Sequence, residues 1–211
     1  MAQAVSYLKD LLSDEGPFDG IFGFSQGAAL ALSYFYQQQA ASQPLAVKFA
    51  VLFSTVMPCS PDPSMGDAII SRLRDLEYDI TSRPPCPLKY ASLTTAEQDF
   101  VSILQRTILD AAVSDSLLPR IDMDVYRNGE RDAIPRIMYP ALLAQKIQIP
   151  TVHVWGKNDA AFMMSMAEVA HSICDENTTK TVRHEGAHDV PKQPTEVKAV
   201  LRALEWAMAR G

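Results

Sequence analysis

Residues 20–30 read Gly-Ile-Phe-Gly-Phe-Ser-Gln-Gly-Ala-Ala-Leu, with the pattern Gly-x-Ser-x-Gly centred on Ser25. A short apolar run before the serine and a strongly helix-forming run after it predict a strand that turns sharply into a helix. We expect Gly23 and Gly27 to keep side chains out of the crowded turn, so that the serine hydroxyl projects into open space. The backbone N–H of Gln26, at the start of the helix, can then point at an oxygen bound beside the serine. We interpret the stretch as a nucleophile elbow, with a purely structural turn as the alternative.

Strand and helix patterns alternate on both sides of this stretch. Runs of β-branched and apolar residues predict buried parallel strands, and apolar positions at helical spacing predict the helices that connect them. The expected strands are 18–23, 47–54, 149–156 and 180–184, and the expected helices are 4–12, 28–35, 140–148, 162–170 and 197–208. The predicted fold class is α/β, with a mostly parallel sheet that carries helices on both faces, in a single domain over residues 1–211.

Residues 57–139 interrupt this alternation with six prolines between positions 58 and 87. Within the interruption, Thr94 and Glu97 have the spacing of a capping box, and apolar residues continue at helical spacing through 100–109. An insertion of this length with its own helices, between two sheet strands, is typical of a lid over a pocket. A peripheral helical excursion that packs on the sheet is the alternative.

Composition limits the kinds of partner. The chain has 211 residues, 47% of them hydrophobic and 21% charged, with a net charge of −6. Nucleic acid and anionic membranes are poor candidates for partners because a basic surface that could release their counterions is absent. No apolar run is long enough to span a membrane, and the amino terminus lacks the pattern of a secretion signal. The sequence predicts a soluble, cytoplasmic protein.

Metal and cofactor chemistry find little support in the sequence. Cys59, Cys86 and Cys174 are widely spaced and odd in number, so neither a disulfide framework nor a zinc site is indicated. The chain also has no phosphate-binding loop, dinucleotide fingerprint or paired-carboxylate site. We therefore expect no metal and no organic cofactor.

Three residues are expected to carry the chemistry: Ser25, Asp159 and His188. Each follows the carboxyl end of a predicted parallel strand, which is the edge where such sheets bind ligands. A serine needs a base near neutral pH, and the base needs a carboxylate that fixes its tautomer. The chain order Ser, Asp, His is the order of nucleophile-elbow enzymes.

Other histidines and acids compete for these roles. A mid-strand position for His153 and a helical position for His171 favour structural imidazoles, and His184 ends a strand, whereas His188 follows a glycine in a loop. Asp19 lies at the wrong end of the predicted sheet. The remaining acids near the candidate site are interpreted as solvated charges: Asp175, Glu176, Glu185 and Asp189.

Three blocks carry a family resemblance. They are Phe-Asp-Gly-Ile-Phe-Gly-Phe-Ser-Gln-Gly-Ala at 18–28, Ile-Pro-Thr-Val-His-Val-Trp-Gly-Lys-Asn-Asp at 149–159, and His-Glu-Gly-Ala-His-Asp-Val-Pro at 184–191. Together they resemble the fungal-type serine hydrolase family of the α/β-hydrolase superfamily, tightly at the blocks and loosely in the insertion. The resemblance implies Ser25 as nucleophile, Asp159 as acid, His188 as base and the Gln26 amide as an oxyanion donor, in agreement with the reading of the residues themselves.

The resemblance also implies a class of reaction. Family members include carboxylesterases and, in gene clusters for secondary metabolites, thioesterases that release polyketide chains from a carrier domain of a synthase. The long insertion resembles the second group, so an acyl ester or thioester is the expected substrate, with a carrier-bound polyketide as one form of it. A general carboxylesterase is the alternative within the family.

The amino terminus departs from the family pattern. Members have strands and a first crossover ahead of the elbow strand, including a loop that completes the oxyanion hole, where this chain has a single predicted helix. By that pattern about ninety residues are missing ahead of the elbow strand. The elbow strand then becomes an edge of the sheet. The loss of one oxyanion donor is expected to lower the rate of the catalysed reaction roughly 10²–10³-fold. The departure motivates a second hypothesis, a non-catalytic protein that binds an acyl carrier or another partner.

Overall fold

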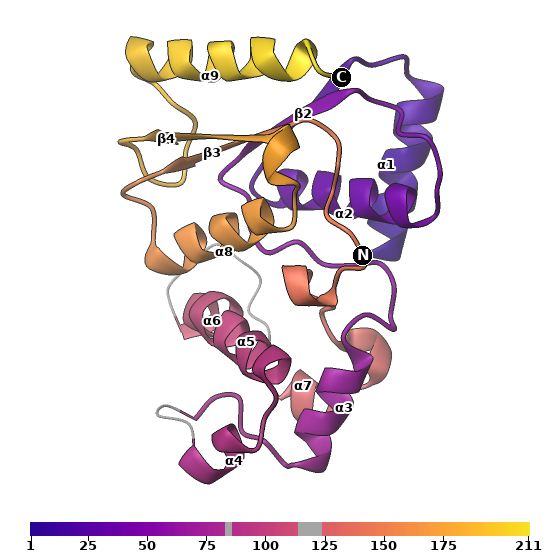
Figure 1. Cartoon of the computed structure of the whole chain (residues 1–211), viewed down its shortest axis with the longest axis vertical. Helices are drawn as coiled ribbons and strands as arrows, with labels where there is room; N and C mark the ends of the chain where they lie inside the picture. Colours follow the sequence, from indigo (N-terminus) through magenta and orange to yellow (C-terminus); the bar gives the residue numbers. More distant parts are fainter. Residues whose placement is uncertain (83–85, 114–123) are drawn as a thin grey trace. The chain divides into compact units, whose positions relative to one another are not determined.

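A computed structural model describes residues 1–82, 86–113 and 124–211. The chain divides into two compact units (Figure 1). The first, here called the sheet unit, contains Met1–Pro61 and Ile137–Gly211, and the second, here called the helical unit, contains Asp62–Arg136. Each unit is described by itself.

The sheet unit is built on four parallel strands in the order β1-β2-β3-β4. Their bounds are β1 Gly20–Phe24, β2 Phe49–Phe53, β3 Thr151–Gly156 and β4 Thr179–His184. Strands β2 and β3 are buried nearly throughout, as continuous apolar sequences require when helices cover both faces of a sheet. The parallel sheet and the α/β class predicted from the sequence are confirmed.

Helices lie on both faces of this sheet. Figure 1 shows α9 (Pro194–Met208) on one face, and α1 (Ala2–Asp14), α2 (Gln26–Ala40) and α8 (Ala161–Ser172) on the other. Helix α1 packs on α2.

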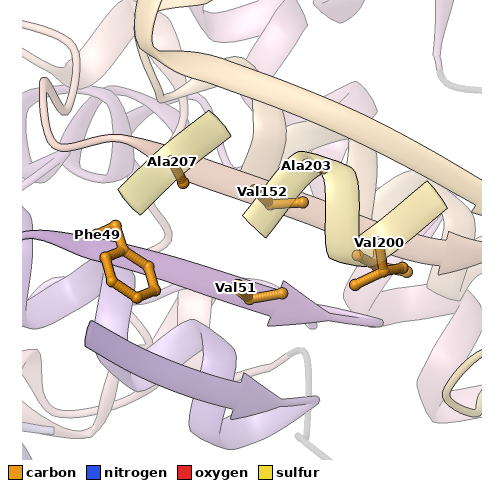
Figure 2. Close-up of a cluster of buried hydrophobic side chains, with 7 residues drawn as sticks. Phe49, Val51, Val152, Val200, Ala203 and Ala207 are labelled. Carbon is orange, nitrogen blue, oxygen red and sulfur yellow. The ribbon is translucent and has the colours of Figure 1, made fainter. Parts of the chain in front are cut away.

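Alternation along the strands assigns side chains to the two faces. Toward α9, apolar side chains of β2 and β3 form a buried cluster with one face of the helix (Figure 2): Phe49, Val51, Val152, Val154, Val200, Ala203 and Ala207. The alanines of α9 let the helix approach the strands closely. On the opposite face of β3, His153 lies against His171 of α8. The cluster packs α9 against the sheet. The candidate site lies at the carboxyl edge of this sheet.

All elements of the helical unit are helical over the residues described. They are α3 (Asp67–Asp75), α4 (Pro87–Ala91), α5 (Thr95–Leu104), a π-helical segment Gln105–Leu109, α6 (Asp110–Val113), α7 (Val125–Asn128) and a 3₁₀ turn Arg131–Ala133. The predicted capping box opens α5, because the Thr94 hydroxyl accepts from Glu97 N at 3.3 Å and the Glu97 carboxylate accepts from Thr94 N at 2.7 Å.

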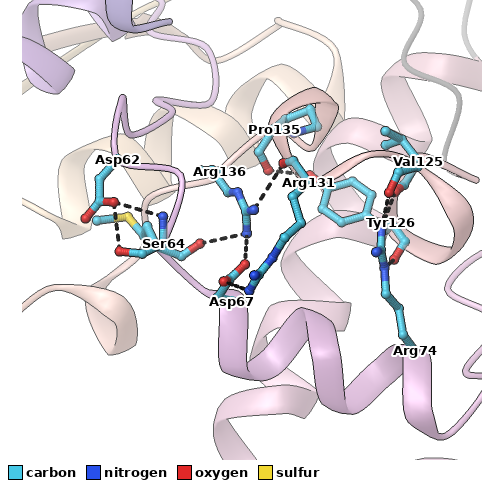
Figure 3. A network of polar contacts seen from close by, with 11 residues as sticks. Asp62, Ser64, Asp67, Arg74, Val125, Tyr126, Arg131, Pro135 and Arg136 are labelled. Carbon is cyan, nitrogen blue, oxygen red and sulfur yellow. Dashed lines mark hydrogen bonds and ion pairs between the residues drawn. The ribbon is translucent and has the colours of Figure 1, made fainter.

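Arginines join the first and last parts of the helical unit (Figure 3). Buried Arg136 pairs with Asp67 at 2.8 Å and donates to the Arg131 carbonyl at 3.1 Å, and Arg131 also pairs with Asp67. Arg74 of α3 donates to the carbonyls of Val125 and Tyr126 in α7 and of Gly129 just after it. These contacts connect residues 62–67 to residues 131–136 within the helical unit.

Two local expectations differ from the structure. The helix expected over 140–148 is reduced to a 3₁₀ turn, Pro140–Leu142, because the backbone near Ile147 pairs with Cys174 in a parallel bridge. Residues 57–61 and 137–139, expected at the ends of the insertion, belong to the sheet unit, where Met138 N donates to Pro58 O at 2.9 Å. Over the described ranges, the structure contains no helix with the length and apolar character needed to cross a membrane.

Candidate active site

Ser25 sits at a sharp bend between β1 and α2. Its backbone has φ 52° and ψ −113°, a conformation that a non-glycine residue rarely adopts. The bend is fixed on both sides, because Ser25 N donates to Phe53 O of β2 at 2.8 Å and Ser25 O accepts from Ala29 N at 3.1 Å. Strain held in place by neighbouring structure is a feature of functional sites. The geometry is that of the predicted elbow.

The two glycines of the elbow differ in their surroundings. A Cβ on Gly23 would lie 2.6 Å from the Ala28 Cα, so the turn requires glycine there. A Cβ on Gly27 would meet no described atom within 4 Å apart from its chain neighbours and the backbone of its own helix. The expectation that Gly27 relieves crowding is therefore wrong for the described part of the chain, and Gly23 alone meets that need.

Asp159 lies in the turn that follows β3. Its Oδ1 accepts from Ala160 N at 2.8 Å, and its Oδ2 lies 2.9 Å from His188 Nδ1. The carboxylate side chain is only 6% exposed. With one oxygen held by the backbone, the other is oriented toward the imidazole.

His188 lies in the loop after β4 and connects the other two residues. Its Nδ1 faces the Asp159 carboxylate and its Nε2 lies 3.0 Å from Ser25 Oγ. When the carboxylate holds the proton on Nδ1, Nε2 is left as an acceptor for the serine hydroxyl. The structure thus brings the three predicted residues together in one chain of hydrogen bonds.

The turn that carries Asp159 is bonded directly to the loop that carries His188. Lys157 N donates to His184 O at 2.8 Å, and Asn158 donates through its N to Gly186 O at 3.1 Å and through its Nδ2 to Glu185 O at 2.6 Å. The Lys157 and Glu185 side chains also pair. These contacts set the separation of acid and base.

Close packing at Gly156, the last residue of β3, adds to this arrangement. A Cβ there would lie 2.1 Å from Gly186 O and 2.3 Å from Ala187 O. On the other side of the loop, the Ser54 hydroxyl donates to Asp189 O at 3.3 Å. The sequence pattern does not mark Asn158, Gly156 or Ser54 as site residues, although Gly156 and Asn158 lie within one of the blocks that carry the resemblance.

The competing histidines lie outside this chain of hydrogen bonds. Burial lowers the pKa of His153 to about 3, and burial also lowers the pKa of His171, against which it packs. His184 is buried and its Nδ1 accepts from Gly186 N at 3.1 Å. Asp19 pairs with Lys48 at 3.0 Å, before the start of β1. The order of preference among histidines and acids agrees with the geometry.

Two further features bear on the chemistry of the site. Gln26 is the first residue of α2, so its N–H has no acceptor within the helix and lies next to the nucleophile. Among the described residues, no group of three or more histidine, cysteine, aspartate or glutamate side chains is placed to hold a metal ion. The three cysteines are free thiols.

Comparison with known proteins assigns the family. Residues 1–200 match the sequence profile of the serine hydrolase (FSH1) family. The chain is 31% identical over 206 residues to esterase alnB of Emericella nidulans, covering 98% of this chain and 72% of that protein. It is also 31% identical over 206 residues to serine hydrolase cnsH of Penicillium expansum, covering 96% of this chain and 83% of that protein.

Among solved structures, the chain is similar to the monoacylglycerol lipase of Paleococcus ferrophilus, at 17% identity and a TM-score of 0.48, over 99% of this chain and 75% of that one. The family assignment rests on the profile and on the two fungal relatives. By these matches, the chain belongs to the FSH1 serine hydrolase family.

Proposed function

We propose that the protein hydrolyses an ester or thioester through an acyl-enzyme on Ser25. The observation that carries the proposal is the continuous chain from Asp159 Oδ2 to His188 Nδ1 and from His188 Nε2 to Ser25 Oγ, at 2.9 and 3.0 Å. Such a chain converts a weakly nucleophilic hydroxyl into an effective one at neutral pH. The names of the fungal relatives, an esterase and a serine hydrolase, agree with this class of reaction.

The proposed reaction has two halves. Ser25 Oγ attacks the acyl carbon while His188 Nε2 takes the hydroxyl proton, and the tetrahedral oxyanion accepts a hydrogen bond from Gln26 N–H. His188 then gives its proton to the departing alcohol or thiol. Water, deprotonated by His188, attacks the acyl-enzyme, and the proton returns to Ser25 Oγ as the acid leaves. Asp159 stabilises the imidazolium in both halves.

The finer proposal is that the acyl group is a polyketide or related chain of secondary metabolism, carried as a thioester. The resemblance in the three sequence blocks and the long insertion support it. Esters and thioesters present the same acyl carbon to Ser25 and differ only in the leaving group. Matched substrates with one acyl chain, as the p-nitrophenyl ester and as the coenzyme A or pantetheine thioester, separate a general carboxylesterase from a thioesterase.

Labelling with a fluorophosphonate probe tests the nucleophile. We expect a single adduct on the peptide that contains Ser25, no adduct in Ser25→Ala, and kcat lowered by at least about 10³-fold in Ser25→Ala and His188→Ala. Ser172→Ala is the matched control, because the Ser172 hydroxyl donates to Val169 O within α8. Absence of the adduct in folded protein, together with absence of hydrolysis, would instead favour a non-catalytic binding protein.

A further inference from the structure

We propose that Phe24, the residue before the nucleophile, is a positioning residue that holds the His188 imidazole in the plane needed for proton transfer. The proposal rests on the function proposed above and adds a fourth side chain to it. The Phe24 ring lies 5.2 Å from the His188 ring, centroid to centroid, with the two planes tilted by 58°. That geometry is an ordinary attractive arrangement for two aromatic rings.

The two hydrogen bonds of His188 depend on how its ring is rotated about the Cβ–Cγ bond. Nδ1 lies 2.9 Å from Asp159 Oδ2, and Nε2 lies 3.0 Å from Ser25 Oγ. Rotation of the ring about Cβ–Cγ moves both nitrogens and turns the lone pair on Nε2 away from the serine hydroxyl. Contact with the Phe24 ring opposes this rotation.

The position of Phe24 is set by the same backbone that sets Ser25. Phe24 ends β1 and is paired in register with Phe53 of β2, whose carbonyl accepts from Ser25 N. Nucleophile and aromatic ring are thus consecutive residues on one hydrogen-bonded strand end. A shift of the base relative to the nucleophile would have to break the Phe24 contact.

The exposure of Phe24 indicates that its main role is not to stabilise the hydrophobic core. Phe24 remains 44% exposed, and Phe22, two residues earlier on the same face of β1, is 60% exposed. Neither residue belongs to the buried core, so truncating either one removes less buried surface than truncating a core aromatic residue. Phe22→Ala is therefore a matched control for Phe24→Ala: the same residue type, the same strand face, but not the residue in ring contact with His188.

Steady-state kinetics on p-nitrophenyl acetate provide the first test. We expect Phe24→Ala to lower kcat roughly 10-fold with KM within about twofold of wild type, because a misaligned base slows proton transfer without changing substrate binding. Phe24→Tyr, which keeps the ring, should restore kcat to within about twofold, and Phe22→Ala should leave both constants within about twofold. Thermal unfolding of each variant accompanies the kinetics.

A proton resonance provides the second test, which does not depend on turnover. The Nδ1 proton shared by His188 and Asp159 is expected downfield in the proton NMR spectrum, and its absence in His188→Ala assigns it. We expect faster solvent exchange or loss of this resonance in Phe24→Ala and its retention in Phe22→Ala and Phe24→Tyr.

The results distinguish the positioning role of Phe24 from the proposed hydrolase function. Unchanged kcat and an unchanged resonance in Phe24→Ala would overturn the positioning role, as would a higher KM at unchanged kcat, which indicates a substrate contact. If wild-type protein neither reacts with fluorophosphonate nor hydrolyses esters, the proposed function fails, and the exchange rate of the Nδ1 proton alone then supports or overturns the role of Phe24.

Discussion

At the scale of single residues, the elbow shows that identical residue types in one motif meet different physical demands. Ser25 adopts a strained backbone conformation that the bonds to Phe53 and Ala29 maintain. Gly23 is needed because the helix that follows passes directly over it, whereas Gly27 lies in the first turn of that helix with open space beside it among the described residues. The motif alone does not distinguish the two glycines, but their packing does.

Alanine substitution at each glycine tests this difference. Gly23→Ala forces a contact of 2.6 Å with the Ala28 backbone and is expected to cost about 1–3 kcal/mol of stability and to displace Ser25. Gly27→Ala should leave stability unchanged or raise it by up to about 1 kcal/mol, since alanine favours a helix more than glycine does. Chemical denaturation and the rate of fluorophosphonate labelling measure both effects. Equal losses in the two variants would show that the packing argument is wrong.

His153 is a residue whose burial makes stability depend on pH. Both ring nitrogens are buried without a hydrogen-bond partner among the described residues, and burial lowers the pKa from 6.5 to about 3. Between these values the unfolded chain binds more protons than the folded protein, so acidification favours unfolding. The contribution approaches about 1.4 kcal/mol per pH unit within this window and vanishes above it.

Replacing His153 with leucine should therefore flatten the loss of stability on acidification from pH 6.5 to 4. At pH 7 the variant should be as stable as wild type or more stable, because two unpaired polar atoms leave the core. A residual slope is expected from His171, whose pKa burial also lowers. Urea denaturation at several pH values measures the slope, and an identical slope in wild type and His153→Leu would contradict the prediction.

At the scale of elements, the site depends on how the turn after β3 joins the loop after β4. Three bonds from Lys157 and Asn158 reach carbonyls of residues 184–186. The carboxylate of Glu196, in the first turn of α9, accepts from Glu185 N at 2.7 Å and connects the same loop to that helix. The loop that carries His188 is thus hydrogen-bonded both to the turn that carries Asp159 and to α9. These bonds preorganise the two residues before any substrate binds.

Gly156→Ala tests the contact between the turn after β3 and the loop after β4. The added Cβ would lie 2.1 Å from Gly186 O, so the loop must move away from the turn, and a displacement near 1 Å at His188 is expected to lower kcat/KM by about 10²-fold. Asn158→Ala removes only the side-chain bond to Glu185 O and should cost less than about 10-fold, in line with a hydrogen bond worth about 1 kcal/mol. Kinetics on a p-nitrophenyl ester measure both variants, and a larger loss in Asn158→Ala would reverse the ranking.

Elements with a strong local pattern were predictable from the sequence, and those decided by distant contacts were not. Apolar runs locate β2 and β3, and the rule that parallel strands end at one edge predicts that Ser25, Asp159 and His188 lie together. The π-helical turn at 105–109 has no sequence signature in its apolar spacing, which continues that of α5. The helix expected at 140–148 is reduced to a 3₁₀ turn at Pro140–Leu142 because the pairing of Ile147 with Cys174 prevails over local propensity.

At the scale of the whole molecule, the three predicted catalytic residues all belong to the sheet unit. The helical unit is inserted into the sequence of the sheet unit between residues 61 and 137. At that junction Cys59 and Ile137 form an antiparallel bridge, and Met138 N donates to Pro58 O at 2.9 Å. The chain ends that flank the helical unit are thus adjacent, so a few residues suffice to join them.

Replacement of residues 62–136 by a short glycine-serine linker tests the independence of the sheet unit. We expect cooperative unfolding and continued fluorophosphonate labelling of Ser25, because the bonds among Ser25, Asp159 and His188 involve no residue of the deleted segment. Ser25→Ala in the same shortened chain is the control for labelling. If the insertion predicted over 57–139 acts as a lid, the ratio of kcat/KM for long and short acyl esters should change in the shortened chain, whereas an unchanged ratio would favour a peripheral excursion. An unfolded or unlabelled product would show that the sheet unit needs the helical unit to form the site.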